Sequence, residues 1–239
     1  MVVAAFFLIA FLYASVGHGG ASGYLAMMVI LGLTQPVMRP MGLLLNLVVS
    51  VIATIQFWRH GHFRMKIFLP LAIASVPMAW IGARMHVPDQ LFKGLLAGCL
   101  VVSIGRILFR LPDVNEKSVR TLPNGLAMVT GAGIGLLSGM IGIGGGILLS
   151  PILLIGRWAG LRETAAVSAP FILVNSLVGL LALDLIHVHF PSGWWLCLPA
   201  VIIGGFLGSW GGSSLFKTTT MKYLLAMVLI IAVGKLIIS

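Results

Sequence analysis

The chain has 239 residues, of which 59% are hydrophobic and only 8% are charged, and its mean hydropathy is +1.12. A soluble domain carries about a quarter charged residues, so this composition excludes a globule with a hydrated surface. The net charge of +10 comes from Lys and Arg residues that stand singly between apolar segments, without a basic face. Scattered loop cations are typical of a membrane protein and argue against a nucleic-acid partner.

Apolar segments follow one another along the whole chain, at 2–16, 20–33, 41–58, 67–83, 91–109, 126–141, 145–156, 164–183, 194–212 and 221–238. A helix needs about 20 residues to span the hydrocarbon core of a bilayer. Six segments are long enough, and the other four form two pairs of shorter segments, each pair joined by a glycine cluster. We therefore expect an all-α integral membrane protein that crosses the cell membrane several times.

The segments form two copies of one unit. A shift of 129 positions pairs Asn46 with Asn175, and a shift of 125 pairs the cluster at 17–20 with the cluster at 142–145. We accordingly divide the chain into a first membrane repeat, a cytoplasmic linker and a second membrane repeat, at 1–110, 111–124 and 125–239.

Loop charge favours an inverted second copy. If each short pair enters and leaves the membrane on one side, one face collects eleven Lys and Arg and the other face four; parallel copies split them eight to seven. The positive-inside rule therefore predicts two inverted repeats, with the linker in the cytoplasm. Each repeat would contain a re-entrant helix pair, broken at the glycines, and three transmembrane helices.

The glycine clusters at 16–20 and 141–146 carry the strongest chemical signal. Glycine inside a helix costs about 1 kcal/mol relative to alanine, so each cluster marks a helix break. A new helix begins after each break, and the free N–H groups and positive dipole end at its start can bind an anion. Two such starts meeting near the membrane midplane are typical of secondary transporters. Close helix packing is the alternative explanation of the glycines.

Further polar side chains are candidates for the same site. A buried amide such as that of Asn46 can donate to a substrate oxygen or hold two helices together. His18, which replaces Ile143 of the other copy, can donate to an anion, carry a proton or cap the break. The hydroxyls of Ser22, Ser138, Ser150 and Ser168 either line the site or serve helix packing. The predicted substrate-binding residues are Gly17, His18, Gly19, Gly20, Asn46, Gly142, Gly144, Gly145 and Asn175.

Other charged and titratable residues carry weaker signals. Arg39 and Arg162 stand at the start of comparable helices, where they guide anions or act only as topology signals. Two His-x-His pairs, at 60–62 and 187–189, lie in loops without a nearby carboxylate or thiol, and Cys99 and Cys197 lie in apolar runs. We therefore expect no metal site and no cofactor. No nucleophile, base and orienting group occur together, which argues against an enzyme.

The paired glycine clusters, Asn175 and the Leu-Pro pairs at 69–70 and 198–199 resemble the TauE/SafE sulfite exporter family over nearly the whole chain. The residues alone indicate a small anion, and the resemblance implies a sulfur oxyanion such as sulfite. We expect export by alternating access, with the anion held between the two breaks and the amides of Asn46 and Asn175. Uptake or export of an organosulfonate, an anion channel and a non-transporting membrane subunit remain as alternative functions. Assembly into a homodimer is left open.

Overall fold

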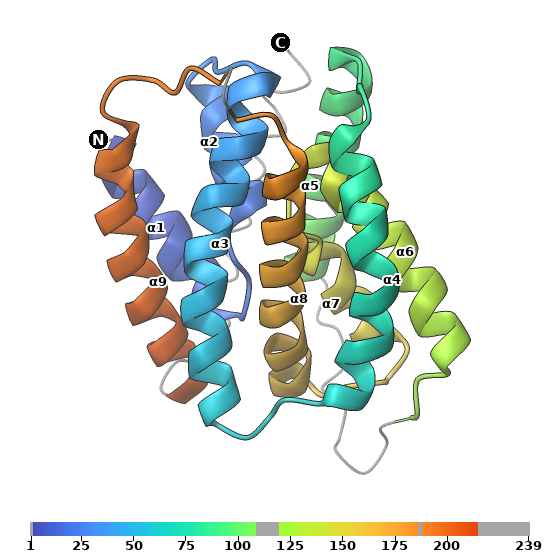
Figure 1. Cartoon of the computed structure of the whole chain (residues 1–239). Coiled ribbons are helices and arrows are strands. Elements are labelled where there is room, and N and C mark those ends of the chain that lie inside the picture. The colour runs from blue at the N-terminus through green and yellow to red at the C-terminus, as the bar shows by residue number, and fades with distance from the viewer. Residues whose placement is uncertain (1, 109–119, 186–187, 215–239) are drawn as a thin grey trace.

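The computed structural model describes residues 2–108, 120–185 and 188–214. The predicted segment 221–238, most of the linker 111–124 and His187 lie outside them. Within the described ranges the chain is helical and forms no strand (Figure 1). The helices are α1 (Val2–Ser15), α2 (Ala21–Ile30), α3 (Gln35–Arg59), α4 (Met65–Arg84), α5 (Asp89–Leu108), α6 (Asn124–Ile141), α7 (Gly146–Ile155), α8 (Leu161–Ala182), the 3₁₀ helix η2 (Trp194–Leu196) and α9 (Cys197–Ser214).

Several of these helices suit a bilayer. Five segments of the described chain are long and apolar enough to cross a membrane, namely α3, α4, α6, most of α8, and α9 together with η2. Large apolar side chains stand on their outer faces, with Ile73 58%, Val129 73% and Leu181 64% exposed. Such exposure is costly in water and favourable in lipid. The predicted all-α membrane class is confirmed.

Two helix boundaries differ from the prediction. α6 begins at Asn124 and has 18 residues, so the segment predicted at 126–141 is long enough to span, and the prediction that it is too short was wrong. α3 begins at Gln35 rather than at residue 41, because Pro36 fits the first helical turn and the charge of Arg39 is buried inside the fold.

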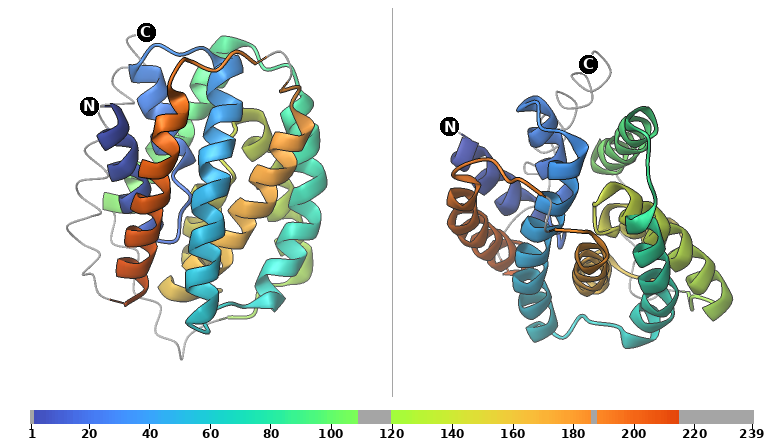
Figure 2. Two further views of the ribbon diagram at one scale, coloured as in Figure 1. Left: turned by 60° about the vertical axis from the view of Figure 1, so that its left-hand side comes forward. Right: turned by 45° about the horizontal axis from the view of Figure 1, so that its top comes forward.

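The helices are arranged in two flanking pairs with α3 and α8 between them. α1 packs along α9 on one side, and α4 packs along α6 on the other (Figures 1 and 2). Each flanking pair thus combines one helix from each copy. α3 and α8 contact one another and form the centre of the molecule.

Glycines allow the flanking pairs to approach backbone to backbone. In α6, a Cβ at Gly131, Gly135 or Gly139 would overlap a backbone carbonyl oxygen of α4. In α9, a Cβ at Gly204, Gly208 or Gly212 would approach a carbonyl oxygen of α1 just as closely. Stripes of small residues at a spacing of four are the usual means of close helix contact in membranes.

Corresponding helices of the two copies run in opposite directions. In Figure 1, α3 runs downward from blue to cyan, whereas α8 runs upward from gold to orange. α4 runs upward and α9 downward in the same view. This is the arrangement expected of the predicted inverted repeats, which stay a prediction. The full pattern of a re-entrant pair and three crossings per copy stays a prediction, because the last segment of the second copy lies outside the described residues.

Candidate functional site

Both glycine clusters interrupt the helical backbone inside the protein. Helices α2 and α7 begin directly after Gly20 and Gly145, whose φ angles of +96° and +80° are left-handed and disfavour any side chain. The preceding helices, α1 and α6, end with equivalent hydrogen bonds. The N–H of His18 bonds to the carbonyl of Tyr13 at 2.9 Å, and the N–H of Ile143 bonds to the carbonyl of Ser138 at 3.3 Å. The predicted helix breaks are confirmed.

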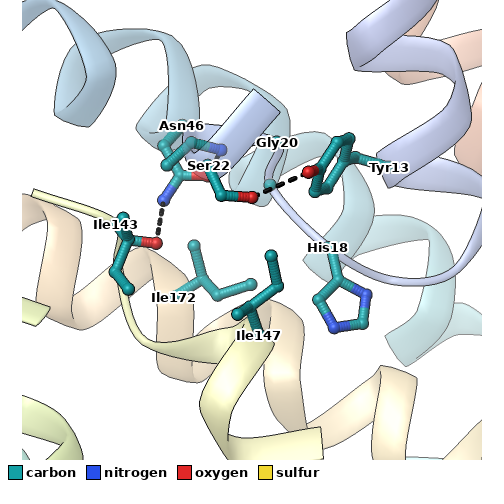
Figure 3. Close-up of a pocket in the computed structure, with 10 residues that line it drawn as sticks. Tyr13, His18, Gly20, Ser22, Asn46, Ile143, Ile147 and Ile172 are labelled. Carbon is teal, nitrogen blue, oxygen red and sulfur yellow. Dashed lines mark hydrogen bonds between the residues drawn. The ribbon is translucent and has the colours of Figure 1, made fainter. Parts of the chain in front are cut away.

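A small pocket lies where the two breaks meet α3 and α8 (Figure 3). It has room for about one water molecule. An oxyanion of several heavy atoms is larger than this, so the pocket would have to widen to hold one. The lining residues are Tyr13, His18, Gly19, Gly20, Ala21, Ser22, Asn46, Ile143, Ile147 and Ile172.

Asn46, on α3, lies between the two breaks. Its Oδ1 accepts a hydrogen bond from the N–H of Ala21, the first residue of α2, at 3.2 Å. Its Nδ2 donates to Ser176 Oγ on α8 at 2.9 Å and to the carbonyl of Ile143 in the second break at 3.4 Å. A Cβ at Gly19 or Gly144 would overlap the Asn46 amide. These two glycines therefore make the space that the amide occupies.

Ile172, on α8, holds the place that Asn46 holds on α3. Both side chains lie against Gly19 and Gly144. Seven residues earlier on each helix, Arg39 lies against Gly142 and Ala165 lies against Gly17. Since 172 minus 46 is 126, the central helices of the two copies correspond at a shift of 126 rather than 129.

Asn175 does not line the pocket, although the sequence predicted it there as the counterpart of Asn46. Its Oδ1 accepts from Ser75 Oγ of α4 at 2.6 Å, and its Nδ2 donates to the carbonyl of Phe171 at 2.9 Å. Asn175 lies in the chain between Ile172 and Ser176, which both contact Gly144, but its own amide bonds to Ser75 and joins α8 to α4.

The other predicted residues take up two kinds of position. His18, Gly19, Gly20 and Asn46 line the pocket. The remaining glycines form the breaks and pack behind the pocket, Gly17 on Ala165, Gly142 on Arg39, Gly144 on Asn46 and Gly145 on Ile134.

The pocket is polar on one side and apolar on the other (Figure 3). The polar side comes from the first copy and includes His18, Ser22 and Asn46. At the shifts of 125 and 126, their counterparts in the second copy are Ile143, Ile147 and Ile172, and these line the same pocket. A ligand bound here therefore meets hydrogen-bonding groups on one side and isoleucine side chains on the other.

Hydroxyl groups extend the polar side of the pocket. Tyr13 Oη lies 2.7 Å from Ser22 Oγ at the pocket wall. Ser150 Oγ, on α7, lies 3.0 Å from His18 Nε2 and 2.9 Å from Ser168 Oγ on α8. Of the serines considered from the sequence, Ser22 alone lines the pocket.

Arg39 is a buried charge that the sequence analysis placed at a helix start. It is 8% exposed, and its guanidinium donates to the carbonyls of Ala83 and Gly139 at 2.8 and 2.9 Å. These carbonyls belong to the last turns of α4 and α6, where the helix dipole favours a cation. In the sequence, the burial of Arg39 is indicated by its spacing of seven residues from Asn46, which puts both residues on one face of α3. Arg162, in contrast, is exposed at the start of α8.

Comparison with known proteins decides the family. The family described as "Sulfite exporter TauE/SafE" matches residues 2–236 of the chain. The chain belongs to the TauE/SafE family. It is therefore a multi-pass membrane transporter, and the resemblance seen in the sequence is confirmed.

Two curated relatives of this TauE/SafE transporter are similar over most of their length. The "Probable membrane transporter protein y4hK" of Sinorhizobium fredii (strain NBRC 101917 / NGR234) is 35% identical over 238 residues, which cover 98% of this chain and 96% of the relative. The "Probable membrane transporter protein YdhB" of Bacillus subtilis (strain 168) is 25% identical over 223 residues, which cover 89% and 88%. No solved structure gives a significant match.

Proposed function

We propose that this TauE/SafE transporter exports a small sulfur oxyanion, most of all sulfite, and binds it in the pocket at the start of α2. The observation that carries the proposal is the meeting of the Ala21 N–H, the Asn46 amide and both helix breaks at one pocket. The N–H groups in the first turn of α2 have no helical acceptor, and the helix dipole is positive there.

The charge around the pocket suits an anion. No Asp or Glu occurs in residues 1–88 or 117–162, which include both breaks and helices α1, α2, α3, α6 and α7. A cation would find no carboxylate ligand on these elements, whereas an oxyanion meets no repulsion from them. An oxyanion entering the pocket competes with Asn46 Oδ1 for the Ala21 N–H and accepts from Asn46 Nδ2.

Transport requires the pocket to widen, because it has room for only about one water molecule in the structure. The contacts that would change lie between copies: Asn46 with Ser176, and His18 with Ser150. Alternating access then follows if α3, α8 and the helices that begin at the two breaks shift relative to one another and open the pocket to one side of the membrane at a time. Each anionic charge that leaves a negative interior gains about 2.3 kcal/mol per 100 mV, which drives export.

The apolar side of the pocket supports a second substrate. An organosulfonate carries its oxygen atoms at one end and a hydrocarbon group at the other. Its hydrocarbon end would contact Ile143, Ile147 and Ile172 while its oxygens face Asn46. Methanesulfonate is the smallest anion that tests this alternative.

The test is flux of labelled sulfite in proteoliposomes that hold the purified protein, with an imposed potential and sulfate as competitor. We expect sulfite flux that rises with the potential and is little affected by sulfate. Flux of methanesulfonate without flux of sulfite would move the substrate to the organosulfonates. Absence of both fluxes under every imposed gradient would contradict the proposal.

A further inference from the structure

His18 combines a titratable side chain with a place in the pocket wall. It is 2% exposed and contacts both copies, since it lies in the first break and its Nε2 reaches Ser150 of α7. Histidine is the side chain whose unperturbed charge changes nearest to neutral pH. The other five histidines are at positions 60, 62, 86, 187 and 189, all outside the two breaks. His18 is therefore the group in the pocket wall that is best suited to take up and release a proton.

The hydrogen bonds around His18 fit both of its charge states. Nδ1 lies 2.9 Å from the carbonyl of Val16, which only accepts, so the bond places a proton on Nδ1. In neutral His18, Nε2 accepts from the Ser150 hydroxyl at 3.0 Å. In charged His18, Nε2–H donates to Ser150 Oγ, and the Ser150 hydroxyl turns to the carbonyl of Gly146, also at 3.0 Å. One hydroxyl rotation accommodates the proton without movement of heavy atoms.

The surrounding elements carry few charges that could compensate an imidazolium. The titratable or charged residues on them are Tyr13 of α1, Tyr24 of α2, Arg39 and Arg59 of α3, Asp89, Lys93, Cys99 and Arg106 of α5, and Arg162 and Glu163 of α8. α7 has none, and Glu163 forms an ion pair with Arg64 at the start of α8. A buried cation is costly without an opposite charge close by. An anion bound in the pocket supplies that charge.

From this arrangement we infer that His18 binds a proton together with the transported anion, so that proton and anion are carried in the same direction. The inference rests on the transport function proposed above. Coupling between two binding sites is reciprocal: the anion favours protonated His18, and protonated His18 favours the anion. Anion affinity should consequently fall as the pH rises. Because the second copy has Ile143 at the equivalent place, each pocket couples one proton.

The test is calorimetric titration of sulfite into the purified protein, in buffers of different ionisation heat and from mildly acidic to mildly alkaline pH. The dependence of the heat on the buffer counts the protons taken up per bound anion. His18→Ile, which copies the second break, and His18→Gln, which keeps a polar side chain, are the comparison variants. Protons exchanged by sulfite itself are common to all proteins and cancel in the difference.

We expect the wild type to take up about one more proton per anion than the variants at the alkaline end, with the pH dependence of its affinity steeper by about tenfold per pH unit. The variants should bind sulfite more weakly. If they bind none, Ser150→Ala is the comparison: it removes the acceptor of the imidazolium and should shift proton uptake to lower pH.

The outcomes separate the two hypotheses. Sulfite binding with equal proton uptake in wild type and variants, or with no shift in Ser150→Ala, would overturn the role of His18 and leave the transporter proposal standing. A wild-type protein that binds no sulfite at any pH would overturn the proposed substrate and the inference together. In proteoliposomes, an imposed pH gradient should drive sulfite in the direction of the protons, and this effect should be lost in His18→Gln.

Discussion

Replacing Gly144 with alanine is expected to reduce sulfite flux on the order of a hundredfold while the protein still folds. The new Cβ would overlap the Asn46 amide, and Ser176 Oγ, 2.7 Å from the Cβ position, leaves the amide no room on that side. Displacing the amide breaks its hydrogen bonds to Ala21, Ile143 and Ser176. The displaced amide no longer offers Nδ2 to the anion, and losing a hydrogen bond to a charged group, worth about 1.5 to 3 kcal/mol, lowers a binding constant by up to about a hundredfold.

The control for this substitution is Gly32→Ala. Gly32 has a φ of +74°, close to the +70° of Gly144, but its Cβ position has no atom within 4 Å. Backbone strain is thus matched, and crowding of the pocket is present at Gly144 alone. Flux per folded protein, measured in proteoliposomes, should remain near the wild-type value in Gly32→Ala. Equal losses in both variants would assign the effect to backbone strain rather than to the site.

Replacing Gly135 with leucine is expected to prevent the close packing of α6 on α4. The Cβ at this position would overlap the carbonyl oxygen of Ser75, and a helix backbone cannot move aside as a side chain can. Overpacking in a core costs about 1 to 3 kcal/mol, and separating two backbones along a whole interface costs at least the upper value. We therefore expect little folded protein, measured as the monodisperse fraction after detergent extraction and as thermal stability.

Gly133→Leu is the matched control for the packing prediction. Gly133 lies two residues earlier on α6, is exposed, and has no atom within 4 Å of its Cβ position. The same substitution there removes a helix glycine and should raise stability by up to about 1 kcal/mol. A Gly135→Leu protein as stable as Gly133→Leu would show that the α4–α6 contact is looser than the structure describes.

The sequence was sufficient for the class of fold and for the helix breaks. Both depend on local properties, since hydropathy over a segment decides its solvent and clustered glycines interrupt a helix wherever they occur. The boundaries of α3 and α6 were harder to predict. Arg39 carries a charge that is normally placed in a loop, and its burial depends on carbonyl groups at the ends of two other helices.

The two-sided character of the pocket could not be predicted because the repeat was aligned by residue identity. Matching Asn46 with Asn175 gave a shift of 129, whereas the contacts with the breaks give Ile172 as the counterpart. Ile172 and Ser176 both lie against Gly144, whereas Asn175 bonds to Ser75 of α4, so the predicted level along α8 was right and the predicted face of the helix was not. The isoleucine side of the pocket was therefore missed, apart from Ile143.

The central claim is that the oxyanion binds between the two breaks at Asn46, and the most direct measurement compares sulfite flux in Asn46→Ala and Asn175→Ala. The substitution is identical in both, and both amides are 1% exposed with hydrogen bonds to other helices or backbone. The account predicts that flux per folded protein is lost in Asn46→Ala and largely retained in Asn175→Ala, which should lose mainly stability through the unpaired Ser75 hydroxyl. Wild-type flux in Asn46→Ala, or equal loss in both variants, would contradict it.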